Sequence, residues 1–548
     1  MRSWRTSRRN SGANDPHRTR SASLILPGPL PPIHFGEHVA TPSHQSAPMT
    51  SEQDTAFFGQ PRGLSTLFFT EMWERFSYYG MRAILILFMT APLAMGGLGF
   101  DTATAGPIYG LYTAMVYLLA LPGGWFADRV VGQQRAVLYG GITIMFGHIS
   151  LAMDSIQFFL LGLFLVIIGT GLLKPNISTI VGQLYSPEDR RRDAGFSIYY
   201  MGINLGAMIA PLVCGFLAQD ERFRSMLEGW GFDPARSWHW GFGAAAVGMF
   251  LGIVQYLLGK RNLRGAGEAP NDPLSEGARR GSMLGLIALL VIGAAVLLTV
   301  GDRAIAAMGT VNKVIGTVLL ITPVAFFAWL LTAGSRDRDE RKRHLVIFVL
   351  FLGASVFWSA FEQAGSTLNL FAERSTRTSI LGFEFPASWF QSVNAAFIIL
   401  LAPVFAWLWI KLGNREPSSP GKFAFGLLFL SLGFALLIPA ARLAAGGQQV
   451  SPMWLLGTYL FHTIGELSLS PVGLSAMTKL APSRYAGLML GVWFLASSVG
   501  NFIGGNVAGF YETFTTDQIF TAVTLFVLVM AGILALFVKP IKRMLARA

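Results

Sequence analysis

Six polar side chains recur every three or four residues between positions 71 and 82, within an otherwise apolar stretch. This spacing places them on one face of a helix. An ionisable group at mid-bilayer costs at least about 2.5–3.5 kcal/mol on insertion scales, so such a stripe must face other protein or water. Carboxylates beside a guanidinium can take up protons and bind charged ligands. The stripe consists of Glu71, Glu74, Arg75, Tyr78, Tyr79 and Arg82.

A structural ion-pair ladder is the alternative interpretation, because Glu71 and Arg75 can pair at a spacing of four residues. Such a ladder does not need the two tyrosines or the second arginine. Three more charges, Lys174, Glu362 and Glu466, stand alone in apolar segments and therefore need partners. Other polar or amphipathic residues in these segments are more often helix–helix contacts than ligands. They include Asn204, Trp358, Asn394, Trp493 and Ser497.

The elements that position these groups are expected to be transmembrane helices. Of the 548 residues, 52% are hydrophobic and only 13% are charged, against roughly 25% in an ordinary soluble domain. A chain this apolar cannot cover itself with polar side chains and has to meet lipid. This excludes a soluble enzyme, a disordered protein and a nucleic-acid-binding protein, despite the net charge of +12. Strand signals are absent, so we expect an all-α integral membrane protein.

A membrane span needs about 20 mostly apolar residues, and the chain contains fourteen such segments. An even number puts both termini on one side. The loops on that side carry about three times as many Lys and Arg as the opposite loops, which predicts cytoplasmic termini in the plasma (inner) membrane. The expected helices are 64–94, 103–127, 134–153, 155–178, 194–218, 238–258, 282–300, 314–333, 344–372, 387–410, 423–441, 451–478, 485–510 and 518–538.

Two of these helices, Met283 to Val300 and Val314 to Ala333, carry no ionisable group. We interpret them as a peripheral hairpin between two six-helix halves, the alternative being ordinary lipid-facing spans of the core. A weak sequence similarity between the loops at 124–135 and 411–415 supports two related halves. Such internal repeats are typical of secondary transporters. The expected domains are a leader (1–60), a six-helix bundle (61–258), a linker with two extra helices (259–335) and a second six-helix bundle (336–548).

The leader is rich in Arg, Ser and Pro and has no apolar run, so it is not a secretory signal peptide. We expect a disordered tail. A transit peptide is one alternative, and a translation start at Met49 is another, because the membrane pattern follows at once.

Depth arithmetic predicts partners for the lone charges. At about 1.5 Å per residue, Arg82 lies about 24–27 Å along an outward-running helix and Glu362 about 27 Å along another. Lys174 lies about 28 Å, and Glu466 about 22 Å, along inward-running helices. We therefore expect one ion pair, Arg82 with Glu362, above a central site and a second, Lys174 with Glu466, below it. Each pair joins the two halves, as alternate gates require.

This arrangement suggests a mechanism in which protonating a gate carboxylate loosens its ion pair. A substrate that carries both charges can also compete for the gate partners. Glu71, Glu74, Arg75 and Lys174 would link proton state to substrate. Glu466 and Asn394 would hold a cationic end of the substrate, and Arg75 with Lys174 an anionic end.

The motif Glu71-Met-Trp-Glu74-Arg75-Phe76-Ser-Tyr78-Tyr79 resembles the ExxER-F-x-YY signature of the proton-dependent oligopeptide transporter family, within the major facilitator superfamily. The segments 199–206, 361–369 and 389–394 also fit the family, and 123–129 looks like the superfamily's inner-loop motif. The resemblance extends over about residues 57–540, and it implies a major facilitator fold with two extra helices, as in bacterial members.

The same resemblance implies symport of di- and tripeptides with protons. It assigns proton coupling to Glu71, Glu74 and Arg75 with Lys174. It places peptide-lining residues at Tyr78, Tyr79, Tyr117, Asn204, Asn394 and Glu466, with Trp358, Trp493 and Ser497 beside side-chain pockets.

Other chemistry has little support in the sequence. Cys214 is the single cysteine, and no ATP-binding GxxxxGK[ST] motif or nucleophile–base pair is visible. His462 and Glu466 could share a metal ion, but a third ligand is missing, so we expect no metal site and no cofactor beyond a proton gradient. The expected partners of a monomer are peptides, protons and the bilayer. Alternatives are a carrier or exporter of another solute such as nitrate or a drug, and a lipid-bound scaffold or sensor.

Overall fold

The computed structural model describes residues 54–186, 188–482 and 485–545. The predicted leader, including Met49, lies outside them apart from its last seven residues. Those seven residues are held by hydrogen bonds to Arg62 and Arg191, so the expectation of a disordered tail is wrong for residues 54–60. Ten helices of the described part are long and apolar enough to cross a membrane. With α1, α4, α14 and α15 added, and with the two arms of α9 counted separately, the described residues form the fourteen predicted spans.

The first half consists of six spans that follow the predicted boundaries to within a few residues. The second span is interrupted at Leu119, where α2 gives way to α3, and it ends in a π-helical turn (η2). Asp101 and Ser155 cap α2 and α5 by accepting hydrogen bonds from backbone N–H groups. The elements are α1 (Arg62–Thr90), α2 (Thr102–Leu118), α3 (Ala120–Phe126), η2 (Ala127–Val131), α4 (Gln133–Leu151), α5 (Ile156–Gln183), α6 (Arg192–Gln219), the short α7 (Glu221–Gly229), η3 (Pro234–Arg236), α8 (Ser237–Gly259) and η4 (Lys260–Leu263).

The second half repeats this plan. Its first span breaks at Glu362, where a 3-10 turn leads to Ser366 and then to α11. A two-stranded antiparallel hairpin follows, in which Ser379 pairs with Glu384 and Ile380 with Phe383. The elements are α10 (Arg338–Phe361), η5 (Glu362–Gly365), α11 (Thr367–Ser375), β1 (Ser379–Ile380), β2 (Phe383–Glu384), η6 (Ala387–Phe390), α12 (Gln391–Leu412), η7 (Gly413–Arg415), α13 (Ser419–Ala445), α14 (Met453–Leu480), α15 (Ala486–Ala508) and α16 (Thr516–Leu545).

The two extra helices lie between the halves in sequence, as α9 (Glu276–Leu331). The predicted loop at 301–313 is wrong, because this segment is helical and the break is confined to Val300 (φ −122°, ψ 16°). Its run of Ala and other helix-forming residues explains the difference. The first arm packs against α5, where Phe164 meets Gly293. The second arm packs against α10 and α15, and the ring centroids of Phe327 and Phe351 are 5.1 Å apart.

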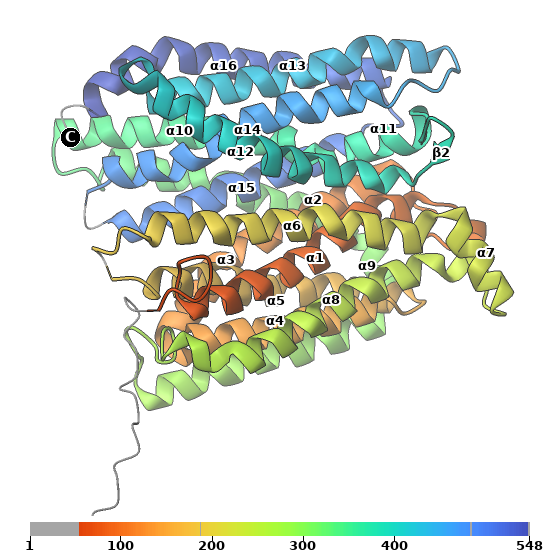
Figure 1. The fold of residues 1–548 in the computed structure, drawn as a ribbon, viewed down its shortest axis with the longest axis horizontal. Coiled ribbons are helices and arrows are strands. Elements are labelled where there is room, and N and C mark those ends of the chain that lie inside the picture. The colour runs from red at the N-terminus through yellow and green to blue at the C-terminus, as the bar shows by residue number, and fades with distance from the viewer. Residues whose placement is uncertain (1–53, 187, 483–484, 546–548) are drawn as a thin grey trace, which may run out of the picture. The chain divides into compact units, whose positions relative to one another are not determined.

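The helices lie side by side along one direction (Figure 1). We call the end where α1 begins and α16 ends the terminal end. The opposite end, which carries α7 and the β1–β2 hairpin, is the far end (Figure 1). Within the first half α1 packs against α6 and α8, and within the second half α13 packs against α14 and α16. Between the halves, α2 packs against α15 and α6 against α12.

The two halves meet closely toward the far end. The backbones of α2 and α15 touch, since a Cβ on Gly505 would lie only 2.1 Å from the Cα of Gly110. Asn369 Nδ2 donates a hydrogen bond to the carbonyl of Ala83 at 2.7 Å. Among the described residues, the hydrogen bonds and ion pairs that join the halves lie in the far-end or middle turns of their helices. The molecule is therefore closed at its far end.

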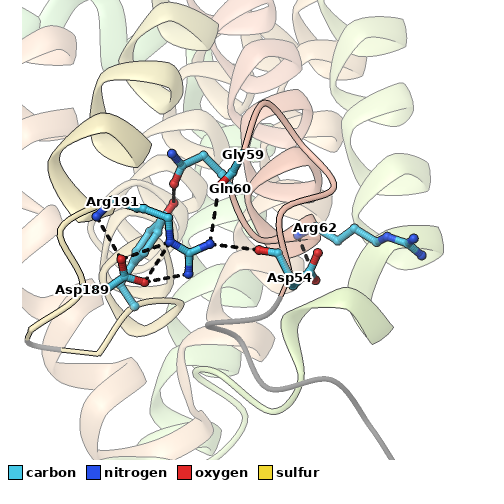
Figure 2. A network of polar contacts seen from close by, with 7 residues as sticks. Asp54, Gly59, Gln60, Arg62, Asp189 and Arg191 are labelled. Carbon is cyan, nitrogen blue, oxygen red and sulfur yellow. Dashed lines mark hydrogen bonds and ion pairs between the residues drawn. The ribbon is translucent and has the colours of Figure 1, made fainter. Parts of the chain in front are cut away.

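The segment before α1 is tied to the turn between α5 and α6, at the terminal end (Figure 2). The Asp54 carboxylate accepts a hydrogen bond from the backbone N–H of Arg62, the first residue of α1, at 3.2 Å. Arg191 donates to the carbonyls of Asp54 (3.0 Å) and Gly59 (3.4 Å) and forms an ion pair with Asp189 at 2.8 Å. The side-chain hydrogen bonds from Arg191 hold the pKa of Asp189 below its usual range. These contacts fix the start of α1, which carries the polar stripe.

The inner-loop motif is held by the linker that follows α8. Asp128 Oδ1 accepts hydrogen bonds from Gln133 Nε2 at 2.6 Å and from Asn271 Nδ2 at 2.9 Å. Arg129 Nη2 lies 3.0 Å from a carboxylate oxygen of Asp272. The linker between α8 and α9 is thus part of the terminal end of the first half.

Candidate substrate and proton site

The polar stripe of α1 forms a buried ion cluster. Arg75 Nε lies 3.2 Å from Glu71 Oε1, which is the pair that the alternative ion-pair-ladder interpretation allowed, and it also contacts the Glu74 carboxylate. The three side chains are at most 3% exposed. Glu74 Oε1 and Arg75 Nη2 have no hydrogen-bond partner among the described residues. The cluster therefore has one more carboxylate than cations and retains unused donor and acceptor capacity.

Two tyrosines extend the stripe toward the far end. The Arg75 guanidinium lies 5.1 Å from the ring centroid of Tyr78 and 5.9 Å from that of Tyr79. The Arg82 guanidinium lies 5.8 Å from the ring centroid of Tyr79. Cation–π contacts of this kind stabilise desolvated cations. Tyr79 thus links the ion cluster to the charge at the far-end side of the stripe.

Arg82 and Glu362 form the ion pair that the depth arithmetic predicts. Arg82 Nη2 lies 2.5 Å from Glu362 Oε2, and the two side chains are 8% and 6% exposed. Arg82 also donates to the Tyr109 hydroxyl at 2.7 Å and to the Glu362 carbonyl at 3.2 Å. The pair joins α1 to the α10–η5 junction, and hence one half to the other, on the closed side. Its role as a gate stays a prediction.

Lys174 and Glu466 do not form the predicted second pair in this conformation. Lys174 Nζ lies 3.9 Å from the ring centroid of Tyr117, and no carboxylate of the described residues is within 4.0 Å of it. Glu466 Oε2 instead accepts a hydrogen bond from Asn394 Nδ2 at 3.1 Å, and the same amide donates to Thr463 at 3.0 Å. The prediction of this pair is therefore not confirmed in a structure that is closed at the far end.

These side chains surround a central cavity of about 270 Å³ between the halves. The first half supplies Lys174 and Arg82, and the second supplies Glu362 and Glu466, so each half brings a cation or an anion to the same space. Most predicted substrate residues line this cavity. They are Tyr79, Arg82, Tyr117, Lys174, Asn204, Trp358, Asn394, Glu466, Trp493 and Ser497.

Four predicted residues do not line the cavity. Glu71, Glu74 and Arg75 are occupied with one another, and Tyr78 is 2% exposed and packs edge-on against Tyr79. Arg75 and Tyr78 do not line the cavity in this conformation, because the ion cluster and the neighbouring rings cover them. Their contact with substrate stays a prediction.

The predicted substrate site omitted four polar lining residues, Tyr200, Gln391, Tyr459 and His462. Gln391 Nε2 donates to the Tyr459 hydroxyl at 3.2 Å and to a backbone carbonyl of the second half. Tyr459 lies seven residues before Glu466 on α14, and two helical turns put both on one face. That spacing is the signal by which Tyr459 could have been found.

The comparisons with known proteins agree with this geometry. The model of the POT family matches residues 134–536. The chain belongs to the POT family. This confirms the resemblance that the α1 motif indicated, and with it a multi-pass membrane protein of the major facilitator fold.

Individual relatives of this POT family member align with about nine-tenths of its chain. It is 44% identical to an uncharacterized transporter of Bacillus subtilis (strain 168), over 89% of this chain and 95% of that one. It is 36% identical to a di-/tripeptide transporter of Lactococcus lactis subsp. cremoris, over 90% and 98%. A crystal structure of a mutant peptide transporter POT in complex with alafosfalin superposes with a TM-score of 0.79 at 41% identity, covering 91% of this chain and 99% of the other. This POT family member is therefore a transporter with the family's fold.

Proposed function

We propose that this protein imports di- and tripeptides together with protons by alternating access. The observation that carries the proposal is the placement of a cation, Lys174, and a carboxylate, Glu466, on opposite halves around a shared cavity. In the described part of the chain neither group has an ion-pair partner within 4.0 Å, and Glu466 accepts a hydrogen bond from Asn394. A peptide is a zwitterion with an amino group at one end and a carboxylate at the other. Lys174 would bind the carboxylate, with Arg75 behind it, while Glu466 and Asn394 would bind the amino group.

The size of the cavity supports a short peptide. Its volume of about 270 Å³ lies near the lower limit of small-molecule sites, which begin at about 300 Å³. The aromatic side chains of Trp358 and Trp493 and the hydroxyl of Ser497 would contact the peptide's side chains. Aromatic walls accept side chains of different shapes, which suits a carrier with broad preference.

The ion cluster on α1 supports proton coupling. Glu71 and Glu74 surround a single guanidinium, so one proton would neutralise the cluster. Protonation of Glu71 or Glu74 would also release Arg75 from one carboxylate and make the electrostatic potential at Lys174 more positive. Glu362 and Glu466 would take part as the carboxylates of the two gates.

The gates would work in alternation. In the conformation described above, Arg82 and Glu362 form an ion pair between the halves, which would close the far end, and Lys174 and Glu466 form no ion pair. After the peptide has been released at the terminal end, opening the far end would separate Arg82 from Glu362 and bring Lys174 and Glu466 together. A ligand shifts such an equilibrium only through its different affinity for the two states.

We infer cytoplasmic termini in the plasma membrane from the Lys and Arg content of the loops on that side. The far end then faces outward. The proton gradient would be the energy source, so the protein would need neither a cofactor nor a metal ion and would carry no enzymatic activity. We expect it to work as a monomer in direct contact with lipid.

Uptake of labelled dialanine into proteoliposomes with an imposed pH gradient tests this function. We expect uptake that a protonophore abolishes and that K174Q and E466Q reduce. Matched controls are K313Q and E228Q, which remove the same charges at exposed positions and should leave uptake unchanged. Uptake of nitrate or a drug instead of dialanine, or uptake that ignores the gradient, would refute the proposal.

A further inference from the structure

An apolar groove runs along the outside of the first half, between α6 and α8 with α1 as its floor. Its volume is about 860 Å³, and its walls include Ile209, Val213 and Val247. A Cβ added at Gly243, which lines the groove, would meet nothing within 4 Å. The groove is therefore an unfilled furrow on the surface that we expect to face lipid.

The length of the groove matches one leaflet. Along α8 its lining runs from His239 to Leu251, which is about 18 Å at 1.5 Å per residue. Half of the hydrocarbon core of a bilayer is about 15 Å thick. The groove starts at the far end of α8 and stops near mid-bilayer, so it fits an acyl chain of the leaflet at the far end.

The mouth of the groove carries both signs of charge. Asp154 Oδ2 lies 4.0 Å from Arg236 Nη2, and Asp154 Oδ1 lies 3.8 Å from His239 Nε2. The side chains of Asp154 and Arg236 are 72% and 63% exposed, so both remain available to a ligand. The half-exposed rings of Trp240 and Phe232 line the same mouth. Trp at such a position marks the level of lipid headgroups.

We propose that this groove binds a zwitterionic phospholipid whose headgroup carries a phosphate and a primary ammonium. The phosphate pairs with the Arg236 guanidinium, which matches phosphate in charge and geometry. The ammonium donates hydrogen bonds to the Asp154 carboxylate, and one acyl chain fills the groove between α6 and α8. An anionic headgroup without the ammonium would place its negative charge near the Asp154 carboxylate and offer that carboxylate no hydrogen-bond donor of opposite charge. Such a lipid would therefore bind less well.

Native mass spectrometry of the purified full-length protein tests the proposal. The protein is released from detergent micelles that contain equal amounts of phosphatidylethanolamine and phosphatidylglycerol. We expect the unaltered protein to retain phosphatidylethanolamine about threefold more than phosphatidylglycerol, as one partly exposed charge pair allows. D154N should abolish the preference, and R236Q should lower retention of both lipids. Both changes are at exposed positions and leave the core intact.

A second pair of variants tests the groove itself. G243L fills the open space and should lower the amount of retained lipid, whereas G285L, at an equally open position on α9, should not. Equal retention of the two lipids by the unaltered protein, or equal effects of G243L and G285L, would overturn the proposal. The readout needs no peptide and no pH gradient, so it is independent of the proposed transport function.

Discussion

Replacing Glu362 by Gln is predicted to open the far end of the molecule. The change keeps the shape of the side chain and removes the charge that pairs with Arg82 at 2.5 Å. Arg82 then stays buried without a counter-ion, although it keeps its hydrogen bonds to the Tyr109 hydroxyl and the backbone carbonyl of residue 362. In the open state water can solvate the guanidinium, so the cost falls mainly on the closed state.

The size of the effect follows from the burial of this pair. Breaking a buried ion pair by removing one partner costs about 3–5 kcal/mol. Since Arg82 keeps two hydrogen bonds, we take the lower value, about 3 kcal/mol, which shifts the closed-to-open ratio by roughly 150-fold. A protein that is mostly closed at the far end would become mostly open there.

Pulsed electron spin resonance between spin labels measures this shift. Labels at M226C on α7 and L381C between the strands, in a C214A background, report the separation of the halves, because both positions are exposed at the far end. We expect the E362Q protein to show a longer distance than its parent. E512Q is the matched control, since it breaks an ion pair with Arg374 (3.1 Å) within the second half. The reasoning is refuted if E362Q leaves the distances unchanged or if E512Q lengthens them equally.

Three further predictions concern the cavity, the interface of the halves and the terminal end. E466Q should lower the affinity for dialanine, measured by competition in a binding assay, by at least about tenfold. The reason is that the change removes the charged hydrogen bond to the peptide's amino group, which contributes about 1.5–3 kcal/mol. G505A should force α2 and α15 apart and lengthen the far-end distance, whereas G532A, with nothing within 4 Å, should not. D189N should lower the melting temperature at pH 7 by a small amount, since a partly exposed pair with Arg191 contributes about 1 kcal/mol or less. Because the folded pKa of Asp189 is lowered, its stabilisation is present above the unfolded pKa of about 3.9 and is lost as pH falls through the folded value, so the two melting temperatures should converge in acid.

The helices were the most predictable part of the fold. Hydropathy and length place most spans to within a few residues, because the bilayer imposes both. Exceptions are the second arm of α9, which begins well before the predicted residue 314, and α16, which extends to Leu545 rather than 538. Local interruptions were not predictable in the same way. The breaks at Leu119 and Ser366, and the continuous helix across the expected loop at 301–313, depend on how each segment packs against its neighbours.

The candidate site shows a similar division. Depth predicted that Arg82 meets Glu362. Spacing allowed Glu71 to pair with Arg75, which was the basis of the alternative ion-pair-ladder interpretation, and the structure contains that pair. The Lys174–Glu466 pair is absent from this structure. If the pair is a gate, as we propose, its formation would depend on which end of the carrier is closed, and sequence carries no information about that choice. Tyr200 and Tyr459 were missed for a different reason, since a tyrosine in a membrane helix is amphipathic and looks the same whether it packs or binds.

Competition between dialanine and its N-acetylated form tests the central claim most directly, namely that charges on opposite halves bind the two ends of a peptide. Both compounds compete with labelled dialanine for uptake by the unaltered protein and by E466Q. We predict that the unaltered protein discriminates strongly against the acetylated form, and that E466Q loses this discrimination because the amino group no longer has its carboxylate. Equal competition by both compounds in the unaltered protein, or discrimination that persists in E466Q, would contradict the account.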